Sequence, residues 1–428
     1  MTHASPAPYE KSTLANGLRV LTIPMPGVRS VTVMVMAAVG SRYESRRENG
    51  IAHFMEHMFF KGALRYPDTM AVSSAIDGVG GVFNAFTSEE KVAYFVKLSS
   101  AKKRIAFDVL SDMLINSRFD ADEIERERGV IVEEIRMYQD DPMSKVQIDF
   151  KRHFYGDQPL GWDIAGPEEN IRAVTRRDFL AFLDEHYAAD NLVLVAAGDI
   201  THDENVSLAR EFFTFTRRRG KKPAPPFAAP TGGVRSILTK REIEQAHFII
   251  GFPAPGDEHA DQPALKVFNN AFGGTMSSRL FHQVRERRGL AYYVRSGRSA
   301  YTDTGAIKIS AGVNVAKLEE AIACVMEEVA KAAAEGLTAD EVAKAKENIK
   351  GRLDLSLEDS MSMASLIAGR EALHGAVKTP EELVAEIDAV TEADVARVAA
   401  TYLDRTKAKL GVLGPYDDIV PFDAALGS

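Results

Sequence analysis

The feature that most constrains the fold of this chain is an internal repeat, in which two segments of the first half recur in the second half. The segment TRRDFLAFLDEHYAADNLVLVAAGDI at 175–200 has the pattern of TEADVARVAATYLDRTKAKLGVLGPY at 391–416. Each reads as a helix with an early acidic residue, followed by a strand of branched aliphatic residues. FDADEIERERGVIVEEI at 119–135 matches LTADEVAKAKENIKGRL at 337–353 in the same way. Because the two independent pairs have nearly the same separation along the chain, they predict a duplicated α/β unit of about 200 residues.

A segment without hydrophobic periodicity separates the two copies. TRRRGKKPAPPFAAPTGG at 216–233 is basic and then rich in proline, alanine and glycine, which is typical of a surface linker. Because 428 residues exceed what one core usually holds, we expect an N-terminal domain at 1–215 and a C-terminal domain at 234–428. The expected fold class is α+β, with two homologous α/β-sandwich domains. Each should have a mainly antiparallel sheet with helices packed on one face.

Two stretches of the first copy predict strands of its sheet. GVFNAFTSEEKVAYFVKL at 81–98 has the pattern of a hairpin that turns at residues 88–90. VTVMVMAAVG at 31–40 is the most apolar stretch of the chain and is too short to cross a membrane. It therefore predicts a buried strand.

The stretch HFMEH at 53–57 carries two histidines and a glutamate on a predicted helix. Residues four apart share a helix face, so His53 and His57 can bind one Zn²⁺ ion through their imidazole nitrogens. Glu56 flanks the same face and can reach a water beside the metal without binding the metal itself. The alternative interpretation is an ordinary amphipathic helix whose histidines are partly buried polar residues.

A zinc site needs a third protein ligand, and the helix predicted at 120–141 offers acidic candidates. At 100° per residue, four residues form its apolar stripe: Ile124, Ile131, Ile135 and Tyr138. Glu127 and Glu134 fall at one edge of that stripe, whereas Glu133 falls on the opposite side and should face water. A carboxylate beside a buried stripe needs a partner, so we assign Glu134 as third ligand and Glu127 as the acid that orients a ligand histidine. Alternatively, both glutamates pair with neighbouring arginines of a solvated helix, Arg128 or Arg136.

The repeat tests whether these polar residues serve the fold or a function. Aligning 119–135 with 337–353, and extending that alignment, places four residues at the positions of the proposed site: Ala271, Gly274, Thr275 and Arg352. The second copy therefore cannot hold the same site, although it should keep whatever the fold requires. The presence of these polar residues in one copy indicates a function carried by that copy.

The motif H-x-x-E-H at 53–57, followed at the same spacing by Glu127 and then Glu134, resembles the signature of the M16 zinc peptidases. This is the family of pitrilysin, insulin-degrading enzyme and mitochondrial processing peptidase. The contexts HFMEHMFFKG and ERERGVIVEEI resemble its processing-peptidase branch, and the similarity runs through nearly the whole chain. The resemblance implies an endopeptidase with one Zn²⁺ per chain, held by His53, His57 and Glu134. Glu56 would be the general base, and peptides or unfolded segments would be cut inside a closed chamber.

The resemblance also implies contacts with substrate. In FGGTMSSRLFHQVRERRGLAYYVRSG at 272–297, Arg285 and Tyr292 match a family pair that faces the substrate carbonyl and the developing oxyanion. A plain helix start after a glycine turn also explains the glycines and serines of this segment. In the FNAFT strand, substrate would be held as an added strand at three residues: Asn84, Ala85 and Phe86.

A chain of this length looks like half of the long pitrilysin type. The resemblance therefore implies a homodimer, or a heterodimer with a related chain. It leaves open whether Arg285 and Tyr292 act on the metal site of their own chain or of the partner.

Composition argues against several other classes of function. A net charge of −9 is unfavourable for a protein that needs a basic face for nucleic acid. No membrane span is expected, because no run of 18 apolar residues occurs. The start of the chain lacks the pattern of a secretion signal and Cys324 is the single cysteine, so a cytoplasmic location is expected. The competing class is a non-catalytic partner or scaffold subunit of an M16-type complex, which typically loses the metal ligands.

Overall fold

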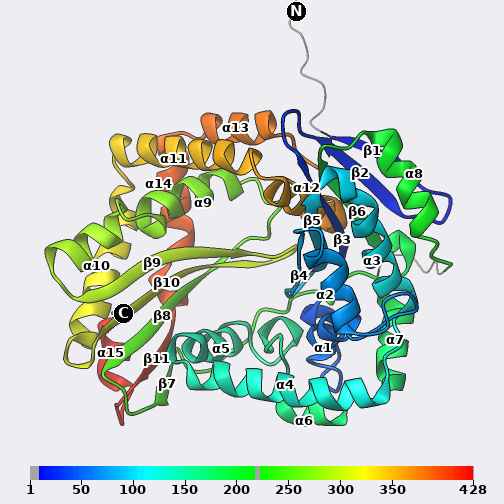
Figure 1. Ribbon diagram of the computed structural model, residues 1–428. Coiled ribbons are helices and arrows are strands. Elements are labelled where there is room, and N and C mark those ends of the chain that lie inside the picture. Colours follow the sequence, from blue (N-terminus) through cyan, green and yellow to red (C-terminus); the bar gives the residue numbers. More distant parts are fainter. Residues whose placement is uncertain (1–8, 217–221, 428) are drawn as a thin grey trace, which may run out of the picture. The chain divides into compact units, whose positions relative to one another are not determined.

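The computed structural model describes residues 9–216 and 222–427, which form two compact units (Figure 1). Within these residues, unit 1 takes the chain up to Arg136, then Trp162–Pro225 and Asp354–Pro380. Unit 2 takes Met137–Gly161, Pro226–Leu353 and the described residues from Glu381 onward. Residues 217–221 of the predicted linker lie outside the described residues, and 222–233 contain no helix or strand.

Each half of the chain gives one segment to the other unit. The segment 137–161 joins unit 2, and the segment 354–380 joins unit 1. The sequence repeat aligns these two segments with each other, since the counterpart of 137–161 in the second copy nearly coincides with 354–380. The compact units therefore differ from the expected ranges 1–215 and 234–428, because each half of the chain exchanges one segment with the other. Apart from this exchange, unit 1 ends at Pro225, inside the predicted linker.

Unit 1 is built on a six-stranded sheet in the order β1-β2-β6-β3-β5-β4. Its strands are β1 (Glu10–Thr13), β2 (Arg19–Pro24), β3 (Ser30–Ala37), β4 (Val82–Thr87), β5 (Val92–Ser99) and β6 (Leu192–Gly198). Only β2 and β6 pair in parallel, and the other neighbours are antiparallel. The predicted hairpin at 81–98 is confirmed as β4–β5, and β4 forms one edge of the sheet.

Helices cover both faces of this sheet. The helices of unit 1 are α1 (Ile51–Phe59), α2 (Thr69–Asp77), α3 (Lys103–Asn116), most of α4 (Ala121–Asp140), α6 (Glu168–Ala173), α7 (Arg176–His186), α8 (His202–Phe212) and α12 (Ser360–His374). On β3, Val31 and Val33 face a core shared with α1 and α3, whereas Met34 and Met36 pack with Ile367 of α12. The predicted buried strand at 31–40 is thus confirmed. It is apolar on both faces, so its second face also needs a cover, and α12 from the segment 354–380 provides it.

Unit 2 repeats the same architecture. Its sheet has the order β7-β11-β8-β10-β9, in which β7 and β11 are parallel, so it matches the unit 1 sheet without β1. Its strands are β7 (Ser236–Lys240), β8 (Gln245–Ala254), β9 (Ala291–Ala300), β10 (Gly305–Asn314) and β11 (Lys409–Gly414). Its helices are α5 (Pro142–Tyr155), α9 (Gln262–Asn269), α10 (Leu318–Glu335), most of α11 (Ala339–Leu357), α13 (Pro380–Ala389), α14 (Glu392–Tyr402) and α15 (Val420–Ala425). The exchanged helix α5 packs Phe150 against Ile249 and Leu413 of this sheet.

The repeat extends to the way helices begin. Helix α7 starts with a capping box between Thr175 and Asp178, and α14 starts with the same box between Thr391 and Asp394. Each box satisfies backbone N–H groups that have no partner inside the helix. Within 9–216 and 222–427, no helix combines the length and apolar character needed to cross a membrane.

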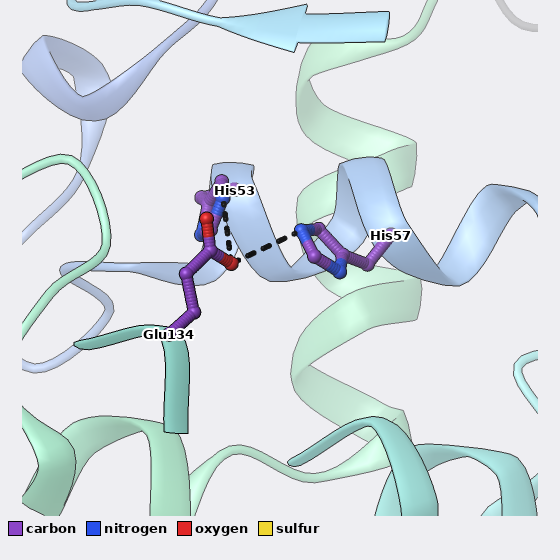
Figure 2. Close-up of side chains that lie close together, drawn as sticks. All are labelled: His53, His57 and Glu134. Carbon is purple, nitrogen blue, oxygen red and sulfur yellow. Dashed lines mark ion pairs between the residues drawn. The ribbon is translucent and has the colours of Figure 1, made fainter. Parts of the chain in front are cut away.

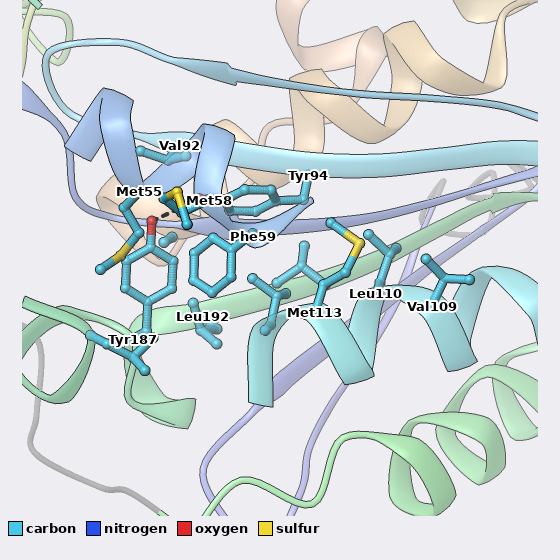
Figure 3. Close-up of a cluster of buried hydrophobic side chains, with 14 of the residues drawn as sticks. Met55, Met58, Phe59, Val92, Tyr94, Val109, Leu110, Met113, Tyr187 and Leu192 are labelled. Atoms are coloured by element: carbon cyan, nitrogen blue, oxygen red, sulfur yellow. Dashed lines mark hydrogen bonds between the residues drawn. The ribbon is translucent and has the colours of Figure 1, made fainter. Parts of the chain in front are cut away.

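Helix α1 turns one face to the core of unit 1. Figure 3 shows Met55, Met58 and Phe59 of α1 beside Tyr94 of β5 and the residue that follows α7, Tyr187. The Phe59 ring lies 5.2 Å from that of Tyr94 and 5.3 Å from that of Tyr187, centroid to centroid, and the two tyrosine hydroxyls share a hydrogen bond of 2.9 Å. The polar residues of HFMEH occupy the other face of α1.

The start of α1 is fixed by a glycine and a buried carboxylate. Gly50 precedes the helix with φ +102°, and a Cβ there would lie 2.6 Å from the carbonyl oxygen of Ala165. Glu44, 2% exposed, accepts hydrogen bonds at its two oxygens from the backbone N–H groups of Gly50 and Ala52, at 2.9 and 2.8 Å, and one from the Asn49 amide. Because burial disfavours the ionised form more than these donors favour it, the pKa of Glu44 rises from 4.5 to about 7.

We predict that Glu44 makes the stability of the protein depend on pH. Its raised pKa means that the folded state binds the proton more tightly than the unfolded chain. Its contribution is therefore present below about pH 4.5 and is lost as pH rises through about 7, by up to about 3 kcal/mol. Unfolding in urea between pH 4.5 and 8 should show this as a falling difference between wild type and Glu44→Gln. Glu169→Gln, at an exposed acid of α6, is the control, and a constant difference for Glu44→Gln would contradict the prediction.

Candidate metal centre

Three polar residues of α1 lie on its half-buried face. His53, Glu56 and His57 are each partly exposed, whereas Phe54, Met55 and four further residues of the helix are buried. The rings of His53 and His57 are 4.7 Å apart between centroids and meet edge to face at 71°. The spacing of four residues thus places both imidazoles side by side, as the sequence predicts.

Glu134 of α4 completes a group of three possible ligands. Its Oε2 lies 3.8 Å from Nε2 of His53 and 3.6 Å from Nε2 of His57 (Figure 2). These separations are too long for hydrogen bonds. They are close to the roughly 3.3 Å that separates two ligand atoms about 2.0–2.1 Å from one tetrahedral Zn²⁺. The three atoms therefore face a common point without contacting one another, and the residues fit a zinc ion.

Glu127 of α4 holds the other nitrogen of His57. Its Oε1 lies 2.8 Å from Nδ1 of His57, and its Oε2 lies 2.5 Å from Nζ of Lys61. Burial tends to raise the pKa of Glu127, but the hydrogen bonds from His57 and Lys61 outweigh it and lower that pKa. The ionised carboxylate accepts the proton on Nδ1, which leaves Nε2 of His57 directed at the common point.

The two histidines differ in their electrostatic surroundings. Burial, together with the nearby His57, lowers the pKa of His53 from 6.5 to about 4, so His53 is neutral near pH 7. Burial also acts to lower the pKa of His57, but the hydrogen bond and charge of Glu127 outweigh it and raise that pKa. The buried Nδ1 of His53 has no hydrogen-bond partner among the described residues.

Glu56 stands beside the ligand group rather than in it. Its Oε2 accepts a hydrogen bond of 2.5 Å from the hydroxyl of Thr87, the last residue of β4. Burial raises the pKa of Glu56, and the Thr87 hydrogen bond and the charge of His57 oppose that rise. A raised pKa suits a carboxylate that must accept and later release a proton.

The predicted substrate strand is β4, and its residues divide between two faces. Phe83 and Ala85 contact the core on the α1 side, whereas Phe86 packs on the opposite side with the core that includes α12. Asn84 is exposed, and its side chain bonds the backbone N–H of Ala85 at 2.8 Å. The structure therefore brings Ala85 to the face of the metal centre and turns the Phe86 side chain away from it.

Arg285 and Tyr292 belong to unit 2. Arg285 lies on a π-helical turn, Phe281–Arg287, with its guanidinium 4.8 Å from the centre of the Phe281 ring. Tyr292 is the second residue of β9 and is 65% exposed. Arg288, which follows this turn, pairs with Glu327 at 2.8 Å.

The predicted faces of α4 are confirmed except at one residue. Ile124, Ile131 and Ile135 are buried, and Glu133 is exposed and pairs with Arg136. Tyr138, placed in the apolar stripe by its spacing, is instead 38% exposed, because unit 1 ends at Arg136 and the helix continues into unit 2. The alternative pairing of Glu127 and Glu134 is wrong: Arg128 pairs with Glu125, and Arg136 pairs with Glu133 and Glu168.

No motif in the sequence marks Lys61, Thr87 or Glu44 as residues near the candidate site. Lys61 follows His57 by four residues, and this spacing could have indicated a place on the same face. Thr87 and Glu44 reach α1 from a strand and from a loop, and no periodicity connects them with it. Only the packed structure reveals these two contacts.

The second copy offers no equivalent centre. The positions that correspond to the three ligands and Glu56 hold Ala271, Gly274, Thr275 and Arg352. In the order of elements, α1 corresponds to α9, which follows β8 as α1 follows β3, and α9 has no histidine or glutamate. The duplicated fold therefore carries these possible metal ligands in unit 1.

Comparison with known proteins agrees with this division. Residues 19–168 match the family described as insulinase (peptidase family M16), and residues 173–349 match the peptidase M16 inactive domain. The chain is 37% identical over 409 residues to an uncharacterized zinc protease of Mycobacterium leprae, covering 95% of this chain and 92% of that protein. It is 36% identical over 381 residues to an uncharacterized zinc protease of Bacillus subtilis, covering 89% and 92%.

Solved structures show the same fold over nearly the whole chain. A protease from Helicobacter pylori superimposes with a TM-score of 0.90 at 25% identity, covering 95% of this chain and 99% of that one. A peptidase M16 inactive domain from Pseudomonas fluorescens gives a TM-score of 0.88 at 19% identity, covering 96% and 98%. With its two matched regions, its zinc-protease relatives and this shared fold, the chain belongs to the M16 peptidase family.

Proposed function

We propose that this chain is a zinc-dependent endopeptidase that hydrolyses peptides or unfolded segments within a closed chamber. The observation that carries the proposal is the convergence of His53, His57 and Glu134, whose ligand atoms all lie within 4.8 Å of one another. The names of the relatives from Mycobacterium leprae and Bacillus subtilis support a zinc-dependent protease.

Zinc suits this donor set. Two imidazole nitrogens and one carboxylate oxygen are the ligands of catalytic zinc sites, which keep a fourth position open. When bound, the ion would polarise the scissile carbonyl and lower the pKa of the attacking water. Glu127 would hold the His57 ring in place from its far side.

Glu56 is the proposed general base. It neighbours His57 in sequence and lies on the same helix face, and its Oε1 makes no hydrogen bond among the described residues. Glu56 would take a proton from the attacking water and return it to the leaving amine. Glu56 must therefore be ionised before the water attacks, because a protonated glutamic acid could not accept that proton.

The edge strand β4 is the proposed binding place for the peptide backbone. An edge strand presents unpaired N–H and C=O groups, and an extended peptide can add to them with little demand on its sequence. Asn84, Ala85 and Phe86 would contribute backbone groups, with the Ala85 side chain on the face of the metal centre.

Arg285 and Tyr292 complete the proposal as donors to the substrate. Both side chains are substantially exposed on unit 2, with Arg285 at 42% and Tyr292 at 65%. Tyr292 would stabilise the oxyanion and Arg285 would hold a substrate carbonyl. We propose a dimer of identical or related chains, in which these two residues serve their own metal centre or that of the partner.

The first test is zinc content combined with cleavage of a mixed pool of unfolded peptides. We predict about one zinc ion per purified chain and cleavage that stops on chelation and returns with added zinc. Zinc without cleavage would indicate a missing partner chain or a narrow substrate. The absence of both, even after zinc is added, would favour the non-catalytic scaffold.

Replacing Glu56 separates the base from the metal ligands. Glu56→Gln should keep zinc at the wild-type level, because Glu56 provides none of the three ligand atoms. Its kcat should fall by about 10²- to 10⁴-fold, the usual contribution of a general base. Steady-state kinetics with one quenched fluorescent peptide would measure this, and undiminished turnover would remove Glu56 from its assigned role.

Replacing Glu127 tests the support of His57. Glu127→Ala leaves the Nδ1 proton of His57 without its acceptor, so zinc affinity should fall by about 10- to 100-fold. Competition with a chromophoric chelator would measure the affinity. Glu133→Ala, also on α4 but 71% exposed in its side chain, is the matched control and should leave affinity unchanged. Equal affinities for both variants would contradict the role of Glu127.

A further inference from the structure

The carboxylate of Glu56 is held by one hydrogen bond. The hydroxyl of Thr87 donates to its Oε2 at 2.5 Å, and no other hydrogen-bond partner of Glu56 occurs among the described residues. Glu56 lies on α1 and Thr87 ends β4, so this bond joins the metal-binding helix to the edge strand of the sheet. Neither residue is among the three possible ligands.

We propose that Thr87 is a positioning residue that orients the Glu56 carboxylate for proton transfer and couples it to the strand that receives the peptide. This inference rests on the proposed peptidase function and adds a residue to it. Thr87 acts through Glu56 and does not itself contact the reacting atoms.

The physical reason is the softness of the last torsion of a glutamate. Rotation about the bond that carries the carboxylate is broad, so a glutamate without a partner samples many orientations. A general base must stand within about 2.6–3.2 Å of the group that gives up the proton. The bond to Thr87 occupies Oε2 and leaves Oε1 of Glu56 available, so one orientation of the carboxylate is selected before substrate binds.

The position of Thr87 gives this bond a second consequence. Thr87 shares a face of β4 with Ala85 and Phe83, the face on the α1 side, and it pairs with Val92 at the end of the hairpin. A peptide added to β4 would take its register from the same strand that anchors Glu56. The distance between the base and the scissile bond is therefore set through a single strand rather than through a mobile loop.

A purely structural role for the Thr87 hydroxyl predicts different effects of its loss. If Thr87 only satisfies a partly buried carboxylate, its loss should lower stability and leave turnover of the folded enzyme unchanged. If it positions the base, its loss should lower kcat and leave KM and zinc content nearly unchanged, because peptide binding and zinc binding use other atoms.

The experiment compares Thr87→Val, which keeps the branched shape, with Thr87→Ser, which keeps the hydroxyl. In zinc-loaded protein, Thr87→Val should lower kcat by about 10- to 100-fold, which is less than the loss predicted for Glu56→Gln. KM should stay within about threefold of the wild-type value. Thr87→Ser should restore most of kcat. Ser88→Ala is the matched control, because the neighbouring Ser88 hydroxyl bonds the Lys91 carbonyl in the turn and not Glu56.

A second readout uses the metal-free protein and no turnover. Thr87→Val, Glu56→Ala and the double variant should shift the midpoint of urea unfolding non-additively, because the two side chains contact each other. Additive shifts would overturn the coupling that the inference requires.

The outcomes separate this inference from the proposed function. If Glu56→Gln is inactive, two results overturn this inference and leave the proposed function standing. One is full kcat in Thr87→Val, and the other is a Thr87→Ser variant as slow as Thr87→Val. Full kcat in Glu56→Gln overturns the proposed function and this inference together, because no base would remain at that position. Loss of kcat in Thr87→Val with recovery in Thr87→Ser supports both.

Discussion

The candidate metal centre depends on the burial of one face of α1. Met55, Met58 and Phe59 anchor the helix in the core of unit 1, and Glu44 holds its first backbone N–H groups. A short helix of this length would not be stable alone in water, so its position comes from packing. The burial that fixes α1 also half-buries its polar face, and this is why the pKa of His53 falls while that of Glu56 rises.

Periodicity in the sequence predicted much of this arrangement. The spacing of HFMEH placed two imidazoles on one face, and the angle of 100° per residue separated Glu134 from Glu133 on α4. The stripe failed at Tyr138 because helical periodicity does not show where a helix leaves its core. Likewise, the apolar faces of α5 and α12 indicate burial, but no local pattern tells which of two similar sheets each helix covers. The contacts of Thr87 and Glu44 needed the tertiary structure for the same reason.

The duplication separates what the fold requires from what the metal centre requires. The order of five strands, the single parallel pair and the capping boxes at Thr175 and Thr391 occur in both copies. The helix that each half of the chain gives to the other unit covers one face of the sheet there, α12 in unit 1 and α5 in unit 2. The histidines and glutamates of the candidate centre occur in one copy, and α9, the first helix after the equivalent strand β8, carries neither residue type. The architecture therefore forms without these residues, and only unit 1 partly buries this group of histidines and glutamates.

The His57 ring shows how two helices define the centre before any metal binds. Glu127 lies 2.8 Å from its Nδ1, and Glu134 lies 3.6 Å from its Nε2, so carboxylates of α4 face both nitrogens of one imidazole. These glutamates are seven residues apart, about two helical turns or 10.5 Å along the axis. A rotation of the ring would break the bond to Glu127, and a shift of α4 by one residue would move both carboxylates away. The hydrogen bond from His57 and the packing of Ile131 and Ile135 in the core shared with α1 thus agree on one register of α4, and this register places Glu134 among the three possible ligands.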